Sequence, residues 1–262
     1  MELQHISASL NSIVTETAHF IAEQRKNFTL DAVSDKGLNQ LVSYVDVEAE
    51  KLLVNALSRL VPEAGFITEE NTSDVGRKTL NWIIDPLDGT TNFIHGLPVY
   101  SVSVALAEGQ EILAGAVYEI GRKELFSAWK NGGAWCNGQA IHVSKETELK
   151  NSLMATGFPY YDFEQMDAYI HTLKDLMQST HGLRRMGSAA VDLAYVACGR
   201  FEGFFEYGLH AWDVAAGCLL VKEAGGSLCD FDGKDDFLFG SSIVADNTGI
   251  HSALMQIIEN RF

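Results

Sequence analysis

Apolar residues recur at helical spacing in several stretches of the chain. Over residues 5–26, Ile6, Leu10 and Ile13 and their neighbours return every three or four positions, which predicts an amphipathic helix. A second helical pattern begins just after Asp46 and has Pro62 beyond its end. Further helices are predicted over residues 164–177, 188–198, 213–223 and 250–258.

Shorter apolar blocks bounded by turn residues predict strands. Single strands are expected over residues 65–68, 80–84, 153–156 and 201–205, and three consecutive strands are expected within residues 100–128. Gly132-Gly133 and Asn137-Gly138 bracket a predicted hairpin, whereas residues 34–37 have the composition of a loop. Because strands and helices come in blocks rather than in strict alternation, the sequence predicts an α+β fold in which helices cover mixed sheets.

The composition of the chain fits one large globular unit. It has 262 residues, of which 47% are hydrophobic and 21% charged. Its 4 Pro and 23 Gly, without a triplet period, exclude collagen and a disordered chain. We therefore expect a single unit over residues 1–262, with a soft subdomain boundary near residues 145–151, where the chain turns polar.

The net charge limits the partners of the protein. Lys and Arg number 19 and Asp and Glu number 35, so the formal charge is −16. Such a chain offers no basic surface for direct contact with nucleic acid and is repelled by anionic membranes. An anionic substrate would need a local source of positive charge that the chain as a whole does not provide.

The sequence also predicts a cytoplasmic protein. Its first residues lack the basic and apolar pattern of a secretory leader, and no run approaches the roughly 18 apolar residues of a membrane helix. The cysteines form no Cys-x-x-Cys pair, so we expect reduced thiols rather than disulfides or a zinc site.

Residues 82–93 carry the strongest chemical signal. An apolar strand leads to Asp85, and the proline that follows removes a backbone donor and stops the strand. Asp88 comes three residues later on a sharp turn, so the two carboxylates can converge. Gly89 allows close approach of the backbone, and Thr90 can begin a helical turn whose free N–H groups would bind an anion. The simpler alternative is a corner in which both acids only cap.

Further acidic positions lie at the ends of predicted elements. Glu69-Glu70 follows a strand, Asp213 begins a helix of small residues, and Asp46 stands just before a helix. Taken singly, each has a simpler explanation as a solvated turn or a helix cap. Taken together, these acids and those of residues 82–93 lie at element ends in an otherwise apolar context.

These segments, in this order, resemble the inositol monophosphatase family. The resemblance rests on Glu69-Glu70, Asp85-Pro86-Leu87-Asp88-Gly89-Thr90-Thr91 and Trp212-Asp213-Val214-Ala215-Ala216-Gly217, and it extends over nearly the whole chain through residues 133–138, 184–190 and 223–226. It implies a magnesium-dependent phosphomonoesterase, a layered α-β-α-β-α sandwich of the sugar-phosphatase type with mixed sheets, and a homodimer.

The resemblance also implies which residues bind cations. Glu69, Asp85 and the Leu87 carbonyl match the ligands of one Mg²⁺. Asp85, Asp88 and Asp213 match those of a second, so we expect two ions, or three. All are hard oxygen ligands, which suit Mg²⁺, and the absence of Cys and His from the set argues against zinc.

Catalytic and substrate-binding roles follow in the same way. Thr90 paired with Asp46, and Glu69, are the candidates for activating the attacking water. The expected substrate contacts are Glu69, Leu87, Asp88, Gly89, Thr90, Gly187, Ser188, Ala189, Glu206 and Asp213. Taken without the resemblance, Glu206 is better explained as an acid on a surface strand.

The leading hypothesis for the function is hydrolysis of myo-inositol monophosphate to inositol and phosphate, by two-metal in-line attack of water. Phosphatases of fructose 1,6-bisphosphate, histidinol phosphate and adenosine bisphosphate share the metal motif, although Thr91 is more typical of the inositol branch. In each case the partner is a small phosphorylated polyol, sugar or metabolite. The second hypothesis is a transcription-accessory binding protein with a vestigial phosphatase site.

Overall fold

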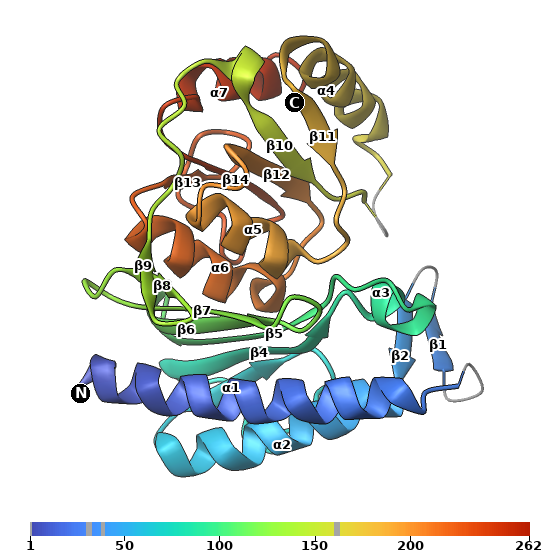
Figure 1. The fold of residues 1–262 in the computed structure, drawn as a ribbon, viewed down its shortest axis with the longest axis vertical. Coiled ribbons are helices and arrows are strands. Elements are labelled where there is room, and N and C mark those ends of the chain that lie inside the picture. Colours follow the sequence, from blue (N-terminus) through green and yellow to red (C-terminus); the bar gives the residue numbers. More distant parts are fainter. Residues whose placement is uncertain (1, 30–32, 38–39, 160–162) are drawn as a thin grey trace.

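The computed structural model describes residues 2–29, 33–37, 40–159 and 163–262, with the side chains of residues 33–42 excepted. Within them, helices and sheets alternate in five layers (Figure 1). Two helices form each helical layer: α1 (Leu3–Lys26) with α2 (Tyr44–Leu60), α5 (Ala189–Ala197) with α6 (Ala211–Glu223), and α4 (Met166–Ser179) with α7 (His251–Glu259). The layered α+β sandwich predicted from the sequence is confirmed.

The larger sheet has seven strands in the described part of the chain. Its order follows the sequence: β3 (Gly65–Thr68), β4 (Leu80–Asp88), β5 (Ser101–Glu108), β6 (Glu111–Glu119), β7 (Glu124–Trp129), β8 (Ala134–Cys136) and β9 (Gln139–Ile141). Strands β3 and β4 are parallel, and each later strand pairs antiparallel with its neighbour. Asn137 and Gly138, both with positive φ, make the predicted tight turn between β8 and β9.

The smaller sheet has five described strands, in the order β11 (Gly182–Arg184), β10 (Leu153–Thr156), β12 (Gly203–Tyr207), β14 (Ser242–Asp246) and β13 (Ser227–Cys229). Strand β10 is parallel to β11 and β12, whereas β14 is antiparallel to β12 and β13. The sequence analysis does not predict β11, β13 or β14. Strands β11 and β13 have three residues each, too few to show a periodicity of their own, whereas the apolar residues 243–245 of β14 are a strand signal that the prediction missed. Residues 142–152, with a 3₁₀ turn at Leu149–Asn151, connect the two sheets. The subdomain boundary near residues 145–151 stays a prediction.

A separate antiparallel pair, β1 (Val33–Gly37) and β2 (Gln40–Ser43), lies beside the short helix α3 (Thr90–His95) (Figure 1). The loop predicted over residues 34–37 is wrong, since these residues belong to β1. The backbone hydrogen bonds with β2 form this strand although its composition is typical of a turn.

Helices α2 and α6 each begin two residues before the acid predicted at their start. Asp46 and Asp213 are therefore the third residues of these helices. Asp46 Oδ2 accepts the Ser43 N–H at 2.9 Å, and Asp213 Oδ2 accepts the His210 N–H at 2.6 Å. Each carboxylate thus satisfies a free donor at the helix start, which corrects the predicted boundaries and gives both acids a defined orientation.

Helix α1 buries one face, as its amphipathic pattern predicts. Ile6, Leu10, Val14 and Ile21 are buried on that face, which packs against the larger sheet together with α2. The rest of the helix is polar and more exposed. Among the described helices, none combines the length and the apolar composition that crossing a membrane requires.

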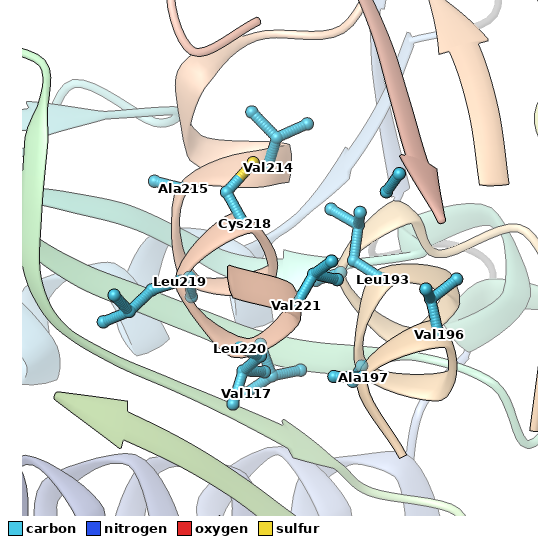
Figure 2. Packing of buried hydrophobic residues seen from close by; sticks show 14 of the residues in the cluster. Val117, Leu193, Val196, Ala197, Val214, Ala215, Cys218, Leu219, Leu220 and Val221 are labelled. Carbon is cyan, nitrogen blue, oxygen red and sulfur yellow. The ribbon is translucent and has the colours of Figure 1, made fainter. Parts of the chain in front are cut away.

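Helices α5 and α6 are buried between the two sheets. Every residue of α5 is buried, as is most of α6, which is typical of helices that are apolar on all sides. Figure 2 shows Leu193 of α5 beside Val221 of α6. The contact is close because α6 has a glycine there: a Cβ at Gly217 would lie 2.5 Å from the Leu193 Cβ.

This close contact predicts that Gly217→Ala destabilises the protein. Overpacking a closed core costs about 1–3 kcal/mol, whereas alanine gains only about 1 kcal/mol over glycine in a helix. We expect a lower melting temperature, measured by circular dichroism. The control is Gly76→Ala, because a Cβ at Gly76 has no neighbour within 4 Å. Equal melting temperatures for the two variants would contradict the close packing of α5 and α6.

Candidate metal centre and adjoining cavity

Three carboxylates from distant segments meet at one point. One oxygen each of Asp85, Asp88 and Asp213 lies within 4.8 Å of the other two. Asp85 and Asp88 belong to β4, whose register with β5 shifts between them. The strand predicted to stop at residue 84 therefore continues irregularly through Asp88. This irregular strand end and the first turn of α6 bring the three acids together.

Glu69 joins this cluster from the neighbouring strand. It follows β3, which is parallel to β4, so the carboxyl ends of both strands lie at the same edge of the sheet. The Glu69 N–H donates to the Ile84 carbonyl at 3.3 Å, and its carboxyl group lies close enough to those of Asp85 and Asp213 to interact electrostatically with both. The structure thus brings together all four acids that the sequence predicts as cation ligands.

Burial and mutual repulsion disfavour ionisation of all four acids at once. Burial, followed by repulsion from Glu69 and Asp88, raises the pKa of Asp85 well above its usual range. Burial and then Asp213 raise the pKa of Glu69 to about 8, and burial and then Asp88 raise the pKa of Asp213 to about 7. Burial raises the pKa of Asp88 to about 6 against hydrogen bonds from the start of α5. Protons or cations must therefore neutralise the cluster.

The donor set fits a hard divalent cation. Carboxylate and carbonyl oxygens are the ligands that Mg²⁺ prefers, and two divalent cations would neutralise four carboxylates. The fifth predicted ligand, the Leu87 carbonyl, lies 3.0 Å from Thr90 Oγ1. The Leu87 side chain is fully buried, so only the backbone of this residue could contact an ion or a substrate.

Thr90 and Asp46, the predicted proton-transfer pair, are hydrogen-bonded. Thr90 Oγ1 lies 3.0 Å from Asp46 Oδ1 and can donate to it. Ser43 holds the other oxygen of Asp46, with its N–H at 2.9 Å and its hydroxyl at 2.6 Å. Asp46 is 1% exposed, and this burial raises its pKa. A fixed carboxylate that readily accepts a proton therefore faces the threonine hydroxyl.

A cavity of about 510 Å³ opens beside the carboxylates, a volume typical of small-molecule sites. Nine of the ten predicted substrate contacts line it: Glu69, Asp88, Gly89, Thr90, Gly187, Ser188, Ala189, Glu206 and Asp213. The tenth, Leu87, does not line it, and neither do Asp85 and Asp46. The structure thus gathers most predicted contacts around one space, with the predicted proton acceptor Asp46 and two predicted metal ligands, Asp85 and Leu87, outside its lining.

Asp88 connects the two sides of this cavity. Its Oδ2 accepts hydrogen bonds from Ser188 Oγ at 2.6 Å and from the Ala190 N–H at 2.8 Å, which join the end of β4 to the start of α5. The next residue, Gly89, has φ 91°, and a Cβ there would lie 3.0 Å from the Gly187 carbonyl oxygen. Both the backbone conformation and the close approach require glycine.

The cavity is also lined by Glu206, Asp192 and Arg185. Glu206 is 5% exposed, so the alternative of a surface acid is wrong. Burial raises the pKa of Glu206 and of Asp192 well above the usual range, and the Arg185 guanidinium opposes both shifts. Our sequence-based site prediction does not include Asp192 or Arg185. An acid inside an otherwise apolar helix was the signal for Asp192, and the signal for Arg185 was its place in residues 184–190, one of the segments that carry the resemblance.

Solved structures with the same fold cover almost the entire chain. The extragenic suppressor protein suhB from Bartonella henselae superposes with a TM-score of 0.91 at 36% identity, covering 98% of this chain and 100% of that one. An IMPase from Thermotoga maritima superposes with a TM-score of 0.87 at 30% identity, covering 99% and 98%. The layered fold is thus shared with proteins of this kind.

Sequence comparison identifies the family. A profile of the inositol monophosphatase family matches residues 2–261. The chain is 42% identical over 228 residues to an inositol-1-monophosphatase of Mesorhizobium japonicum, covering 87% of this chain and 86% of that protein. It is 42% identical over 234 residues to Nus factor SuhB of Escherichia coli, covering 88% of each. The chain belongs to the inositol monophosphatase family.

The repulsion among the acids predicts that Mg²⁺ stabilises the folded protein. A ligand present at 100 times its Kd stabilises the native state by about 2.7 kcal/mol, which for a chain of this size corresponds to about 5 °C or more in melting temperature. Scanning calorimetry in excess MgCl₂ and in EDTA measures this difference. NaCl at matched ionic strength controls for general screening. Identical melting curves in MgCl₂ and in EDTA would contradict a cation site.

Proposed function

We propose that this protein is a magnesium-dependent phosphomonoesterase that hydrolyses a small phosphorylated polyol or sugar, with myo-inositol monophosphate as the favoured substrate. The observation that carries the proposal is the meeting of Asp85, Asp88 and Asp213 beside the cavity. Because the formal charge of the protein is −16, a phosphate dianion would be repelled unless bound cations make the local electrostatic potential positive. The carboxylate cluster would hold such cations beside the cavity. Family membership supports the same class of reaction.

The proposed cation ligands divide into two sets that share Asp85. Glu69, Asp85 and the Leu87 carbonyl would hold one Mg²⁺, and Asp85, Asp88 and Asp213 a second; a third ion is compatible with the proposal. When bound, such cations supply positive charge that attracts the phosphate and stabilises the charge developing in an in-line displacement. The protein keeps the ligands fixed, for example through the His210 N–H, which holds Asp213 Oδ2 at 2.6 Å.

Thr90 and Asp46 are proposed to form the proton path. A water hydrogen-bonded to Thr90 Oγ1 would transfer a proton to this oxygen as Thr90 passes its own proton to Asp46 Oδ1, 3.0 Å away. A threonine hydroxyl is a poor base by itself, so Asp46 is the group that accepts the proton, and its raised pKa favours this role. Glu69, which lines the cavity, is the second candidate base.

The cavity lining supports a monophosphate of a neutral polyol. We propose that the N–H groups of Gly89 and Thr90 bind the phosphate, and that residues 187–189 and Glu206 contact the hydroxyl groups. Near Glu206 lies a second buried acid, Asp192, and Arg185 is the one Lys or Arg among the described lining residues. This charge pattern disfavours the second phosphate of fructose 1,6-bisphosphate or adenosine bisphosphate, and it leaves histidinol phosphate to be tested.

The names of relatives favour a second candidate function. The Escherichia coli relative is named Nus factor SuhB, and the Bartonella henselae structure is that of an extragenic suppressor protein. The alternative proposal is a transcription-accessory protein in which the phosphatase site is vestigial. The charge of −16 disfavours direct contact with RNA, so such a protein would dock on another protein. For either function, a cytoplasmic homodimer stays our prediction.

Asp213→Asn tests the phosphatase proposal. The change removes a negative charge from the cation ligands but keeps the side-chain volume, and the amide oxygen can still accept the His210 N–H. We expect kcat for phosphate release from myo-inositol 1-phosphate to fall about 100-fold or more, with an unchanged circular dichroism spectrum. Asp232→Asn is the control, because Asp232 is exposed and pairs only with Lys234 among described residues. Full activity of Asp213→Asn would reject the assignment.

Co-purification tests the alternative. If the protein acts in transcription through docking alone, the wild type and Asp213→Asn should retain the host RNA polymerase equally on an affinity column. A panel of phosphate esters assayed with restored Mg²⁺ should then show no turnover. Turnover without retention of the polymerase would favour the enzyme.

A further inference from the structure

Glu50 is a buried acid outside the predicted site. It lies on α2 one turn after Asp46 and is 0% exposed. Its Oε2 accepts the Glu70 N–H at 2.7 Å, and its Oε1 accepts the Thr72 N–H at 2.7 Å and the Thr72 hydroxyl at 2.9 Å. Hydrogen bonds to a carboxylate are among the strong ones, and a buried acceptor that loses them is costly. Through these hydrogen bonds, Glu50 attaches residues 70–72 to α2.

Residues 70–72 include a left-handed backbone conformation. Asn71 lies between the two N–H groups bound by Glu50 and has φ 54°, in the left-handed region. This conformation costs most residues about 1–2 kcal/mol, and asparagine adopts it more readily than other non-glycine residues. The Asn71 side chain adds a hydrogen bond of 3.3 Å to the Glu69 carbonyl. The bonds from Glu50 to the N–H groups of Glu70 and Thr72 hold the turn on both sides of Asn71.

The same contacts fix the backbone on both sides of Glu69. The peptide before it donates from Glu69 N to the Ile84 carbonyl at 3.3 Å, and the peptide after it donates from Glu70 N to Glu50 at 2.7 Å. The first bond attaches Glu69 to the larger sheet, and the second attaches it to α2. With both peptides held, the backbone and the Cβ of Glu69 are fixed beside the acids that repel its carboxylate, so only rotation within the side chain can move that carboxylate away.

We propose that Glu50 is a positioning residue that holds the Glu69 carboxylate where it can bind a divalent cation together with Asp85. This inference rests on the proposed function, in which Glu69 is a cation ligand. Asp46, four residues earlier on α2, is bonded to Thr90. One face of α2 thus supports two parts of the site, the Glu69 ligand and the proton path.

Glu50→Gln tests this role. Glutamine keeps the shape of the side chain but replaces one acceptor oxygen by a donor, so the bond to Glu70 or those to Thr72 are lost. Loss of a partner that orients a metal ligand typically reduces metal affinity by about 10- to 100-fold. We expect about tenfold weaker Mg²⁺ binding in calorimetric titration of the metal-free full chain. The Mg²⁺ concentration for half-maximal phosphate release should rise by a similar factor, with kcat at saturating Mg²⁺ within about twofold.

Two further variants separate positioning from general stability. Glu119→Gln is the matched control, because Glu119 is 1% exposed, accepts the Tyr195 hydroxyl at 3.0 Å and does not line the cavity. It should leave the Mg²⁺ affinity unchanged, whatever its effect on the melting temperature. Thr72→Ala removes only the hydroxyl bond to Glu50, and we expect a two- to threefold loss of Mg²⁺ affinity, roughly the share of one hydrogen bond.

The outcomes distinguish this role from the proposed function. If the wild type binds Mg²⁺ and Glu50→Gln binds it equally well, the positioning role is overturned and the phosphatase proposal stands. An equal loss of affinity in Glu119→Gln would overturn it as well, because the effect would then be general. Should Glu50→Gln fail to fold, unchanged affinity in Thr72→Ala overturns the role. Absence of Mg²⁺ binding by the wild type would overturn both proposals.

Discussion

Repulsion among buried and half-buried carboxylates is the constraint on which the rest of this site depends. Glu69, Asp85, Asp88 and Asp213 are poorly solvated and raise one another's pKa. Unrestrained side chains would relieve the repulsion by turning toward water. Each acid is instead held in place by hydrogen bonds to nearby backbone. The unfavourable free energy of keeping the acids together is offset by the close packing of the layers around the site. A site that is unfavourable when empty is well suited to bind cations.

Helix capping supplies part of this restraint. Asp46 and Asp213 both occupy the third position of a helix, and each uses one oxygen to accept the N–H of the residue before the helix. In Asp46 the second oxygen is left for Thr90. A local interaction that begins a helix therefore also orients an acid for chemistry. We expect the same in Asp213, where Oδ2 accepts the His210 N–H and the other oxygen is left to bind a cation.

The central helices decide where the site forms. Helices α5 and α6 lie between the two sheets (Figure 1), so their first turns can meet the end of β4. Asp88 bonds to Ser188 and Ala190 at the start of α5, and Asp213 comes from the start of α6. The cavity lies where these elements converge, and Glu50 supports its β3 side from the outer helix α2.

Local patterns in the sequence determined most helices, the longer strands and the identity of the principal acids, because periodicity and turn chemistry act between neighbouring residues. The turn at Asn137-Gly138 and the motif from Asp85 to Thr90 are of this kind. Tertiary structure alone decided that the three-residue segments β11 and β13 are strands, that Glu206 is buried, and that Arg185 and Asp192 line the cavity. It also decided that Glu50 bonds to Thr72, 22 residues away. Such features depend on which distant segments pack together. The residues next to each position in the sequence do not determine that packing.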